Sequence, residues 1–225
     1  MAKRVLLGSA AVLLVIAAAY ASFFVAPQER TMGVLQRIFY FHVSCAWAGL
    51  TAFSIGFLAN LLYVWKRKQK YDWLGVSCVE VGVAFTTVVL ISGPIWAKPA
   101  WGIYWTWDAR LTSTFILWLL YISYLLLRTL IEEPDRRALL SALFGIFAFI
   151  DVPIVFGAIR WWRTQHPAPV IMGGPNSGLA AGMVPTFFFA VFAMHVFMWF
   201  LIAERYSLEK MRNEVELVRQ EAEAI

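Results

Sequence analysis

The run VLLGSAAVLLVIAAAYASFFV, residues 5–25, contains 21 residues without one charged side chain. A helix of about 20 apolar residues is long enough to cross the hydrocarbon core of a bilayer, which is about 30 Å thick. Five further apolar blocks follow, and over the whole chain 61% of the residues are hydrophobic and only 15% are charged. Such a chain has too few polar side chains to cover its surface in water, so we place it in a membrane.

The blocks are continuously apolar and do not alternate, which favours helices over strands. The predicted fold class is therefore all-α, a polytopic membrane bundle of six transmembrane helices: 5–25, 38–65, 73–95, 111–127, 139–159 and 185–203. We assign residues 1–204 to this membrane domain. Residues 205–225, in which both signs of charge recur at helical spacing, are predicted to form a cytoplasmic helical tail.

Basic residues set the expected orientation, because Lys and Arg are enriched in cytoplasmic loops. With the N-terminus inside, the inner segments carry 13 of the 19 basic residues, so both termini are expected in the cytoplasm. This topology also explains the net charge of +5 better than a nucleic-acid partner does. A competing interpretation treats Lys3-Arg4 and the first block as a cleavable signal peptide, but the block is longer than a typical signal core.

Two segments on the predicted outer side, 96–110 and 160–166, carry six of the 11 tryptophans. Tryptophan commonly forms a belt at the membrane interface. A belt explains less well why four tryptophans fall within 12 residues on one side. The alternative is an apolar shelf for a flat ligand with acidic groups at one edge. The residues alone leave belt and shelf equally open.

A short interfacial helix over residues 100–110 would place Trp101, Trp105 and Asp108 on one face, at i, i+4 and i+7. Arg110 and Lys98 could then pair with the acidic groups of a ligand lying on that face.

The three histidines differ in predicted depth. His42 begins the second helix and His166 follows the fifth, so both lie at the outer boundary, whereas His195 lies ten residues into the last helix. Two imidazoles are a common way to hold haem iron. We interpret His42 and His166 as a ligand pair beside the tryptophans, and His195 as a hydrogen-bonded packing residue.

Four other residues stand out inside the apolar blocks. Glu80 and Asp151 are acids in predicted spans, and the sequence leaves open whether they mark a polar pathway or hydrogen-bond neighbouring helices. Cys45 and Cys78 are the only cysteines, and their spacing indicates neither a zinc site nor a disulfide framework. The C-x-x-C-H motif of covalent haem attachment is also missing.

The segment WGIYWTWDARLTS, residues 101–113, resembles the tryptophan-rich WWD signature of membrane haem-handling proteins. The WWD segment as a whole covers about residues 96–113. Further matches are FHV at 41–43, GPIWAKP at 93–99 and WWRTQH at 161–166. With six spans and this length, the chain is similar to the CcmC family of the bacterial cytochrome c maturation system. The resemblance covers nearly the whole chain up to the tail.

The resemblance implies haem handling at the periplasmic face of the bacterial inner membrane, for c-type cytochrome biogenesis. It implies transient haem b with one axial histidine on each side of the signature, which by motif position are His42 and His166. The implied partners are a periplasmic haem chaperone of the CcmE type, ABC transporter subunits of the CcmA and CcmB types, and a small single-span subunit of the CcmD type. It implies an assembly factor, not an enzyme.

Our hypothesis is that His42 and His166 ligate the iron from opposite faces. The side chains expected to cover the macrocycle are those of Trp101, Trp105 and Trp107. Asp108 is expected to orient the loop or contact the chaperone, and Arg110 to pair with Asp108 or with a haem propionate.

Two rival functions remain open at this stage. An electron-transfer cytochrome b subunit needs paired histidines inside the bundle, where only His195 is deep. A small-solute transporter would be built around Glu80 and Asp151 and would keep its activity without either outer histidine.

Overall fold

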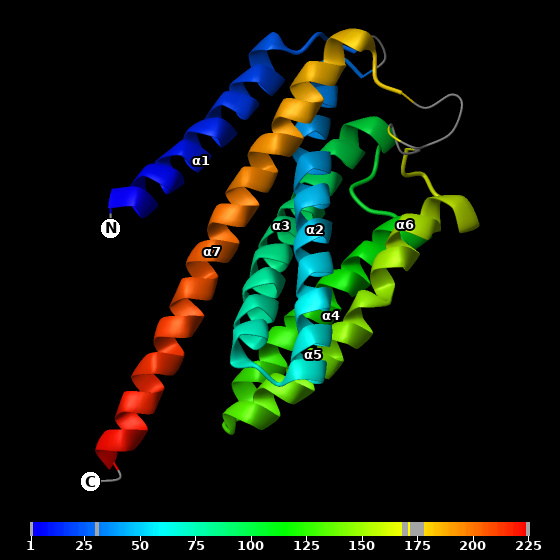
Figure 1. Ribbon diagram of the computed structural model, residues 1–225. Helices are drawn as coiled ribbons and strands as arrows, with labels where there is room; N and C mark the ends of the chain where they lie inside the picture. Colours follow the sequence, from blue (N-terminus) through cyan, green and yellow to red (C-terminus); the bar gives the residue numbers. More distant parts are fainter. Residues whose placement is uncertain (1, 30–31, 168–170, 172–177, 224–225) are drawn as a thin grey trace.

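The computed structural model describes residues 2–29, 32–167, 171 and 178–223, and within them it contains helices and no strand (Figure 1). In chain order the helices are α1 (Ala2–Tyr20), η1 (Ala21–Val25), η2 (Val34–Gln36), α2 (Arg37–Lys66), α3 (Gln69–Trp101), α4 (Ala109–Leu130), α5 (Pro134–Phe149), α6 (Asp151–Trp161), η3 (Ala181–Met183) and α7 (Val184–Glu223). In the part of the chain that the structure describes, six helical segments are long and apolar enough to cross a membrane, which confirms the predicted number of spans.

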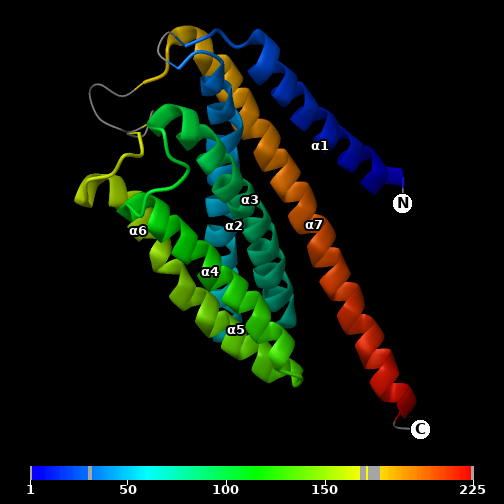
Figure 2. The same ribbon diagram turned by 180° about the vertical axis from the view of Figure 1, so that it is seen from behind.

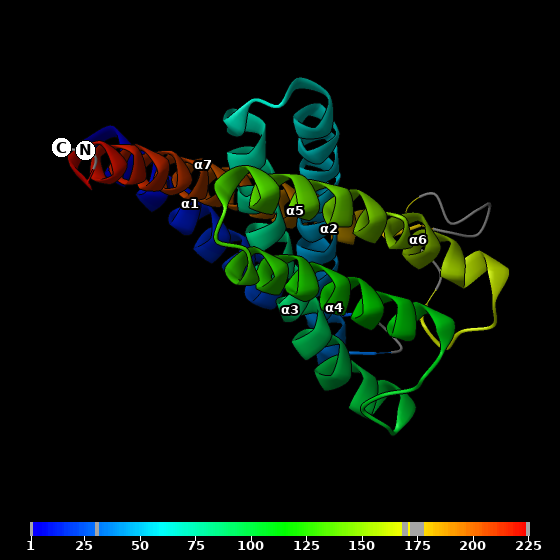
Figure 3. The same cartoon turned by 90° about the horizontal axis from the view of Figure 1, so that it is seen from below.

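The antiparallel pair of α2 and α3 forms the centre of the bundle, with α4, α5 and α6 on one side and α1 and α7 on the other (Figures 2 and 3). Small residues let these helices approach closely, as is common between membrane helices. A Cβ added at Gly82 of α3 would lie 2.4 Å from the ring of Phe53 of α2. The Phe53 ring in turn stacks on Tyr121 of α4, with 3.8 Å between ring centroids.

The third helix contains Pro94 and extends six residues beyond the predicted end at Ile95, through Pro99, to Trp101. Proline is tolerated in membrane helices where neighbouring groups satisfy the freed backbone. α3 ends at Gly102, whose φ of 80° is a left-handed conformation open to a residue without a Cβ. Its N–H donates to the carbonyl of Lys98 at 2.9 Å, and the Lys98 ammonium donates to the Gly102 carbonyl at 2.9 Å.

The fifth predicted span, 139–159, is divided into α5 and α6, which meet at Ile150. Pro153 has no N–H to donate to the carbonyl four residues earlier, so the ladder of hydrogen bonds is interrupted there. The N–H of Ile150 turns back to the carbonyl of Phe147 instead, at 3.1 Å. This break buries Asp151 at the first position of α6, where its Oδ2 has no hydrogen-bond partner among the described residues.

Two carboxylates inside the bundle form ion pairs. Glu80 of α3 accepts two hydrogen bonds from the guanidinium of Arg205 of α7, one of them at 2.7 Å, and Arg205 also donates to Glu209 at 3.0 Å. Asp72 accepts two hydrogen bonds from Arg128 of α4, at 2.6 and 2.9 Å. Glu80 therefore joins neighbouring helices, which is one of the two roles left open by the sequence.

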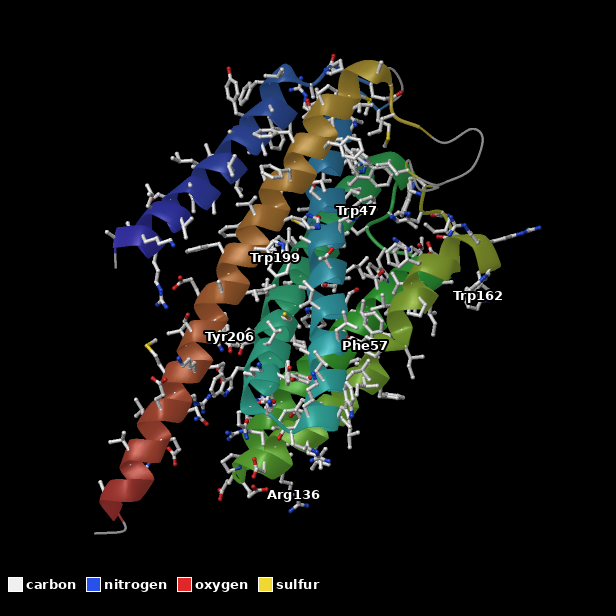
Figure 4. All side chains as sticks on the ribbon, viewed as in Figure 1. Trp47, Phe57, Arg136, Trp162, Trp199 and Tyr206 are labelled. Carbon is white, nitrogen blue, oxygen red and sulfur yellow. The ribbon has the colours of Figure 1, made fainter. Side chains whose placement is uncertain are left out.

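The predicted tail is helical and continues α7 without a break to Glu223. Figure 4 shows Trp199 and Tyr206 along this helix, about two turns apart. The Tyr206 ring contacts Trp73 at the start of α3, with 6.0 Å between centroids. Beyond that contact α7 leans away from α2–α6 (Figures 1 and 2).

Candidate functional site

Three segments bring the predicted site residues to the end of the bundle that lies opposite the C-terminus (Figure 1). They are the first turns of α2, residues 101–110 from the end of α3 to the start of α4, and residues 162–167 after α6. Trp162 lies at the tip of the last of these (Figure 4). Residues 168–170, which come next in the sequence, lie outside the described residues, and none of them is a predicted site residue.

His42 lies in the second turn of α2 and faces α3. Its Nδ1 lies 2.9 Å from the hydroxyl of Ser92, and a Cβ at Gly93 would lie 3.4 Å from its ring. Ser92 donates its only hydrogen to the carbonyl of Val88, at 2.7 Å. Ser92 must therefore accept from His42, which fixes the proton on Nδ1 and leaves Nε2 with a lone pair.

In His166, as in His42, Nδ1 carries the proton and Nε2 has the lone pair. Its Nδ1 lies 2.9 Å from the carbonyl of Pro167, which can only accept, so Nδ1 carries the proton. Its backbone N–H donates to the hydroxyl of Thr164 at 3.0 Å. Burial and the positive charge of Arg110 lower the pKa of His166 below its usual value, so the neutral ring is favoured.

Electrostatic interactions link the two imidazoles across the site. The positive charge of Arg110 lies near enough to act on both His42 and His166, and the negative charge of Asp108 acts on His166. Four of the predicted site residues, from α2, the 102–108 connection, α4 and the segment after α6, thus lie near one another.

Asp108 is the N-cap of α4. Its carboxylate accepts hydrogen bonds from the backbone N–H groups of Arg110 and Leu111, at 3.0 and 3.1 Å, and from the Thr106 hydroxyl at 2.9 Å. Burial raises the pKa of Asp108, but these hydrogen bonds and one from Thr164 outweigh it, so the pKa lies below its ordinary value. The Thr164 bond joins the 102–108 connection to the segment that carries His166.

Arg110 does not form a side-chain ion pair with Asp108 among the described contacts. Its guanidinium donates to the carbonyl of Val155 of α6 and lies over the ring of Phe156, 6.0 Å from the centroid. It thereby ties the start of α4 to α6, in the part of the bundle where α6 leads to His166.

The prediction of a short helix over residues 100–110 is wrong. Residues 102–108 are not helical, because the left-handed Gly102 ends α3 and Asp108 caps a new helix. Trp101 consequently pairs with Trp96, at 5.3 Å between centroids, whereas Trp105 pairs with Trp107, at 5.7 Å.

The four tryptophans between residues 96 and 107 therefore form two groups. One is Trp96 and Trp101 at the end of α3. The other continues from the connection onto Phe115 of α4, which lies 6.2 Å from Trp105 and 6.4 Å from Trp107. Trp107 is 75% exposed, so its apolar face is open to its surroundings. Lys98, proposed to meet a ligand acid, instead lies 5.2 Å over the Tyr104 ring.

His195 has partners for both ring nitrogens. Its Nδ1 donates to the carbonyl of Val191 at 2.8 Å, and its Nε2 lies 3.2 Å from the hydroxyl of Thr51. This matches the interpretation of His195 as a hydrogen-bonded packing residue.

Sequence reasoning missed Ser92 and Thr164. Both are small hydroxyl residues whose roles depend on tertiary contacts. The only available signal was the position of each beside a matched motif: Ser92 precedes GPIWAKP, and Thr164 lies within WWRTQH.

Comparisons with known proteins indicate one family along nearly the whole chain. The family model for CcmC, heme exporter protein C, matches residues 1–224. Heme exporter protein C of Bradyrhizobium diazoefficiens is 32% identical over 192 residues, which cover 84% of this chain and 70% of that protein. A putative cytochrome c biosynthesis ccmC-like mitochondrial protein of Marchantia polymorpha is 30% identical over 190 residues, covering 84% and 80%. Heme exporter protein C of Escherichia coli K12 is 27% identical over 196 residues, covering 87% and 76%. With a family match that includes all but its last residue, this six-span chain belongs to the heme exporter protein C family.

Proposed function

We propose that the chain binds haem at the periplasmic face of the bacterial inner membrane and presents it to a periplasmic haem chaperone during c-type cytochrome maturation. Membership of the family supports haem handling for cytochrome c maturation. One observation carries the assignment to this site: His42 and His166, from separate segments, each engage Nδ1 with an oxygen acceptor, and the charge of Arg110 acts on both rings.

The ligand pair in this proposal is His42 and His166, each binding through Nε2. Haem b supplies an iron with two axial positions and a flat, largely apolar ring. An imidazole binds metal as a neutral ring, and a hydrogen bond from its other nitrogen fixes its orientation. Ser92 supplies the acceptor for His42, and the carbonyl of Pro167 supplies it for His166.

The aromatic side chains of the connection provide apolar cover in this proposal. Trp105 and Trp107 are packed together at 5.7 Å and braced by Phe115, while Trp101 belongs to the neighbouring pair with Trp96. Arg110 uses one guanidinium nitrogen on the Val155 carbonyl. Its other N–H groups are suited to a haem propionate, since arginine carries five donors and binds carboxylates well.

The proposed orientation rests on the distribution of basic residues among the loops, and the proposed partners rest on membership of the family. The excess of basic residues in the opposite loops supports an orientation with this end of the bundle outside and both termini in the cytoplasm. A site at the membrane surface suits transfer, because a chaperone can reach the ligand there. We propose a CcmE-type chaperone as acceptor, and CcmA-, CcmB- and CcmD-type subunits as companions in an ABC-type complex.

The test is ligand replacement with chemical rescue. We expect His42→Gly and His166→Gly each to lose most of the haem that co-purifies with the protein in detergent, measured by its Soret absorption. Added imidazole should restore the spectrum, because a free ligand can occupy the vacated axial position. A variant that merely misfolds is not rescued by imidazole.

His195→Gln is the matched control, because both ring nitrogens of His195 are engaged in packing contacts. It should retain the haem spectrum. Unchanged haem spectra in both outer-histidine variants, or loss of haem only on replacement of His195, would refute the ligand assignment.

A further inference from the structure

The extension of α7 beyond Tyr206 carries a row of exposed apolar side chains. Leu208 is 48% exposed, Met211 45%, Val215 69% and Val218 66%. Their spacings of three, four and three residues are those of the a and d positions in a heptad repeat. Charged residues fill most of the intervening positions, so the row is a narrow apolar seam on an otherwise polar helix.

Charges flank this seam with one sign on each side. When Leu208 and Val215 take the a positions, Arg205, Arg212 and Arg219 all fall at e positions, and Glu214 falls at a g position. In a parallel pair of helices, a g residue of one helix faces the e residue of the following heptad in the other. Glu214 would therefore face Arg219 of a second copy, on both sides of the seam. In an antiparallel pair e faces e and g faces g, so like charges would meet.

We propose that this extension of α7 is an interaction surface for a second copy of the same chain, with which it forms a short parallel coiled coil. The complementary charges select the parallel arrangement. Membrane insertion imposes it too, because two copies in one bilayer direct their α7 extensions the same way. The seam covers about two heptads, which is marginal for free peptides. Anchoring in a membrane raises the effective concentration of the two helices.

The structure leaves room for this approach. Arg4 of α1 reaches the hydroxyl of Ser207 at 2.9 Å, so α1 covers the same face of α7 only down to that residue. Past it, α7 leans away from α2–α6, and its end lies beyond the N-terminus of α1 (Figures 1 and 2). A second copy would thus meet the seam from the side on which α1 lies.

The test is disulfide cross-linking in native membranes. Cys45 and Cys78 are buried and are first replaced by alanine. Val215→Cys or Val218→Cys is then introduced, with Asn213→Cys, at the outward f position, as the matched control. We expect oxidation to give a species of twice the chain mass several-fold more efficiently at 215 and 218 than at 213. Equal yields at all three positions, monomer alone, or adducts only with a different protein would overturn the proposal.

Charge reversal tests the pairing itself. Arg219→Glu should reduce the yield of the Val215→Cys dimer at least several-fold, because Glu214 then faces Glu. Adding Glu214→Arg should restore it, since the exchanged pair is again complementary. If the double variant stays as low as the single one, the parallel register is wrong. The haem spectrum monitors folding in each variant, and the outcome leaves the proposed haem ligands unaffected.

Discussion

The Nδ1 of His42 and the hydroxyl of Ser92 lie 2.9 Å apart across the contact between α2 and α3, and Ser92 acts there as the acceptor. This hydrogen bond constrains the orientation of the His42 ring. The ring lies beside Gly93, where an added Cβ would be 3.4 Å from it, an ordinary contact distance. The consequences of this contact are measurable if His42 is an iron ligand.

Replacing Ser92 by alanine should weaken haem binding and raise the reduction potential of the bound haem. Without the acceptor, the imidazole of His42 becomes less basic and less well oriented, and loss of such a partner typically costs about 10- to 100-fold in metal affinity. Equilibrium haem titration and a spectroscopic redox titration measure both effects. Ser92→Thr keeps the hydroxyl and should behave as the parent protein. Parent-like affinity and potential in the alanine variant would contradict the role of Ser92.

Acidification should release haem only at a pH below 6.5, the ordinary pKa of histidine. Burial and Arg110 lower the pKa of His166, so protons compete with iron for this ring only when the pH falls further. Arg110→Gln removes the repelling charge and should move the release midpoint to higher pH. Absorption spectra recorded along an acid titration follow the release. A midpoint that stays fixed or falls in this variant would show that Arg110 does not act on His166 in this way.

The N-cap at Asp108 should contribute measurably to stability. Asp108→Ala removes the acceptor for two backbone N–H groups at the start of α4, a change that costs about 1 kcal/mol in typical helices. Asn is an equally good cap, so Asp108→Asn should retain most of the stability at neutral pH. Thermal unfolding in detergent compares them.

The pH dependence separates the charge of Asp108 from its capping geometry. Because the folded-state pKa of Asp108 lies below the ordinary 3.8, the ionised carboxylate adds stability above that value. This contribution is lost as the pH falls through the folded-state pKa. Asp108→Asn should lack this part of the acid sensitivity, and an unchanged acid profile in that variant would argue against it.

The hydrophobic blocks alone were enough to predict the spans, because each block must satisfy its own backbone in lipid. The helix ends were harder. Pro94 favours a helix end, but α3 continues past it. Pro153 lies within an apolar run that predicts one helix, but the helix is divided there into α5 and α6. In both cases the outcome depends on whether neighbouring helices accommodate the disrupted backbone, which a single chain segment does not encode.

For the candidate site, too, the sequence predicted one part and the remainder depends on tertiary structure. Depth along the spans placed His42 and His166 at one end and set His195 apart. The partners that fix the two rings, Ser92 and the Pro167 carbonyl, come from tertiary structure and local loop geometry. The predicted single tryptophan face failed because one glycine, Gly102, ends the helix that would have created it.

The ion pair of Asp72 and Arg128 should be the most sensitive charged contact in the half of the bundle away from the site. Their side chains are only 7% and 10% exposed, and two hydrogen bonds join them. Asp72→Asn leaves a buried guanidinium without its counter-charge, which typically costs about 3–5 kcal/mol. Thermal unfolding in detergent should therefore shift to clearly lower temperature, while the haem spectrum of the folded protein stays unchanged because the site lies at the other end.

Two further variants make this last prediction specific. Asp135→Asn changes a carboxylate at an exposed position, where it accepts from Gln69 at 2.9 Å, and should cost far less. Adding Arg128→Gln to Asp72→Asn removes the unpaired charge, so the double variant should be less destabilised than the sum of the two single changes. Equal unfolding temperatures for Asp72→Asn and Asp135→Asn, or strictly additive losses in the double variant, would mean that the pair is not coupled in the folded protein.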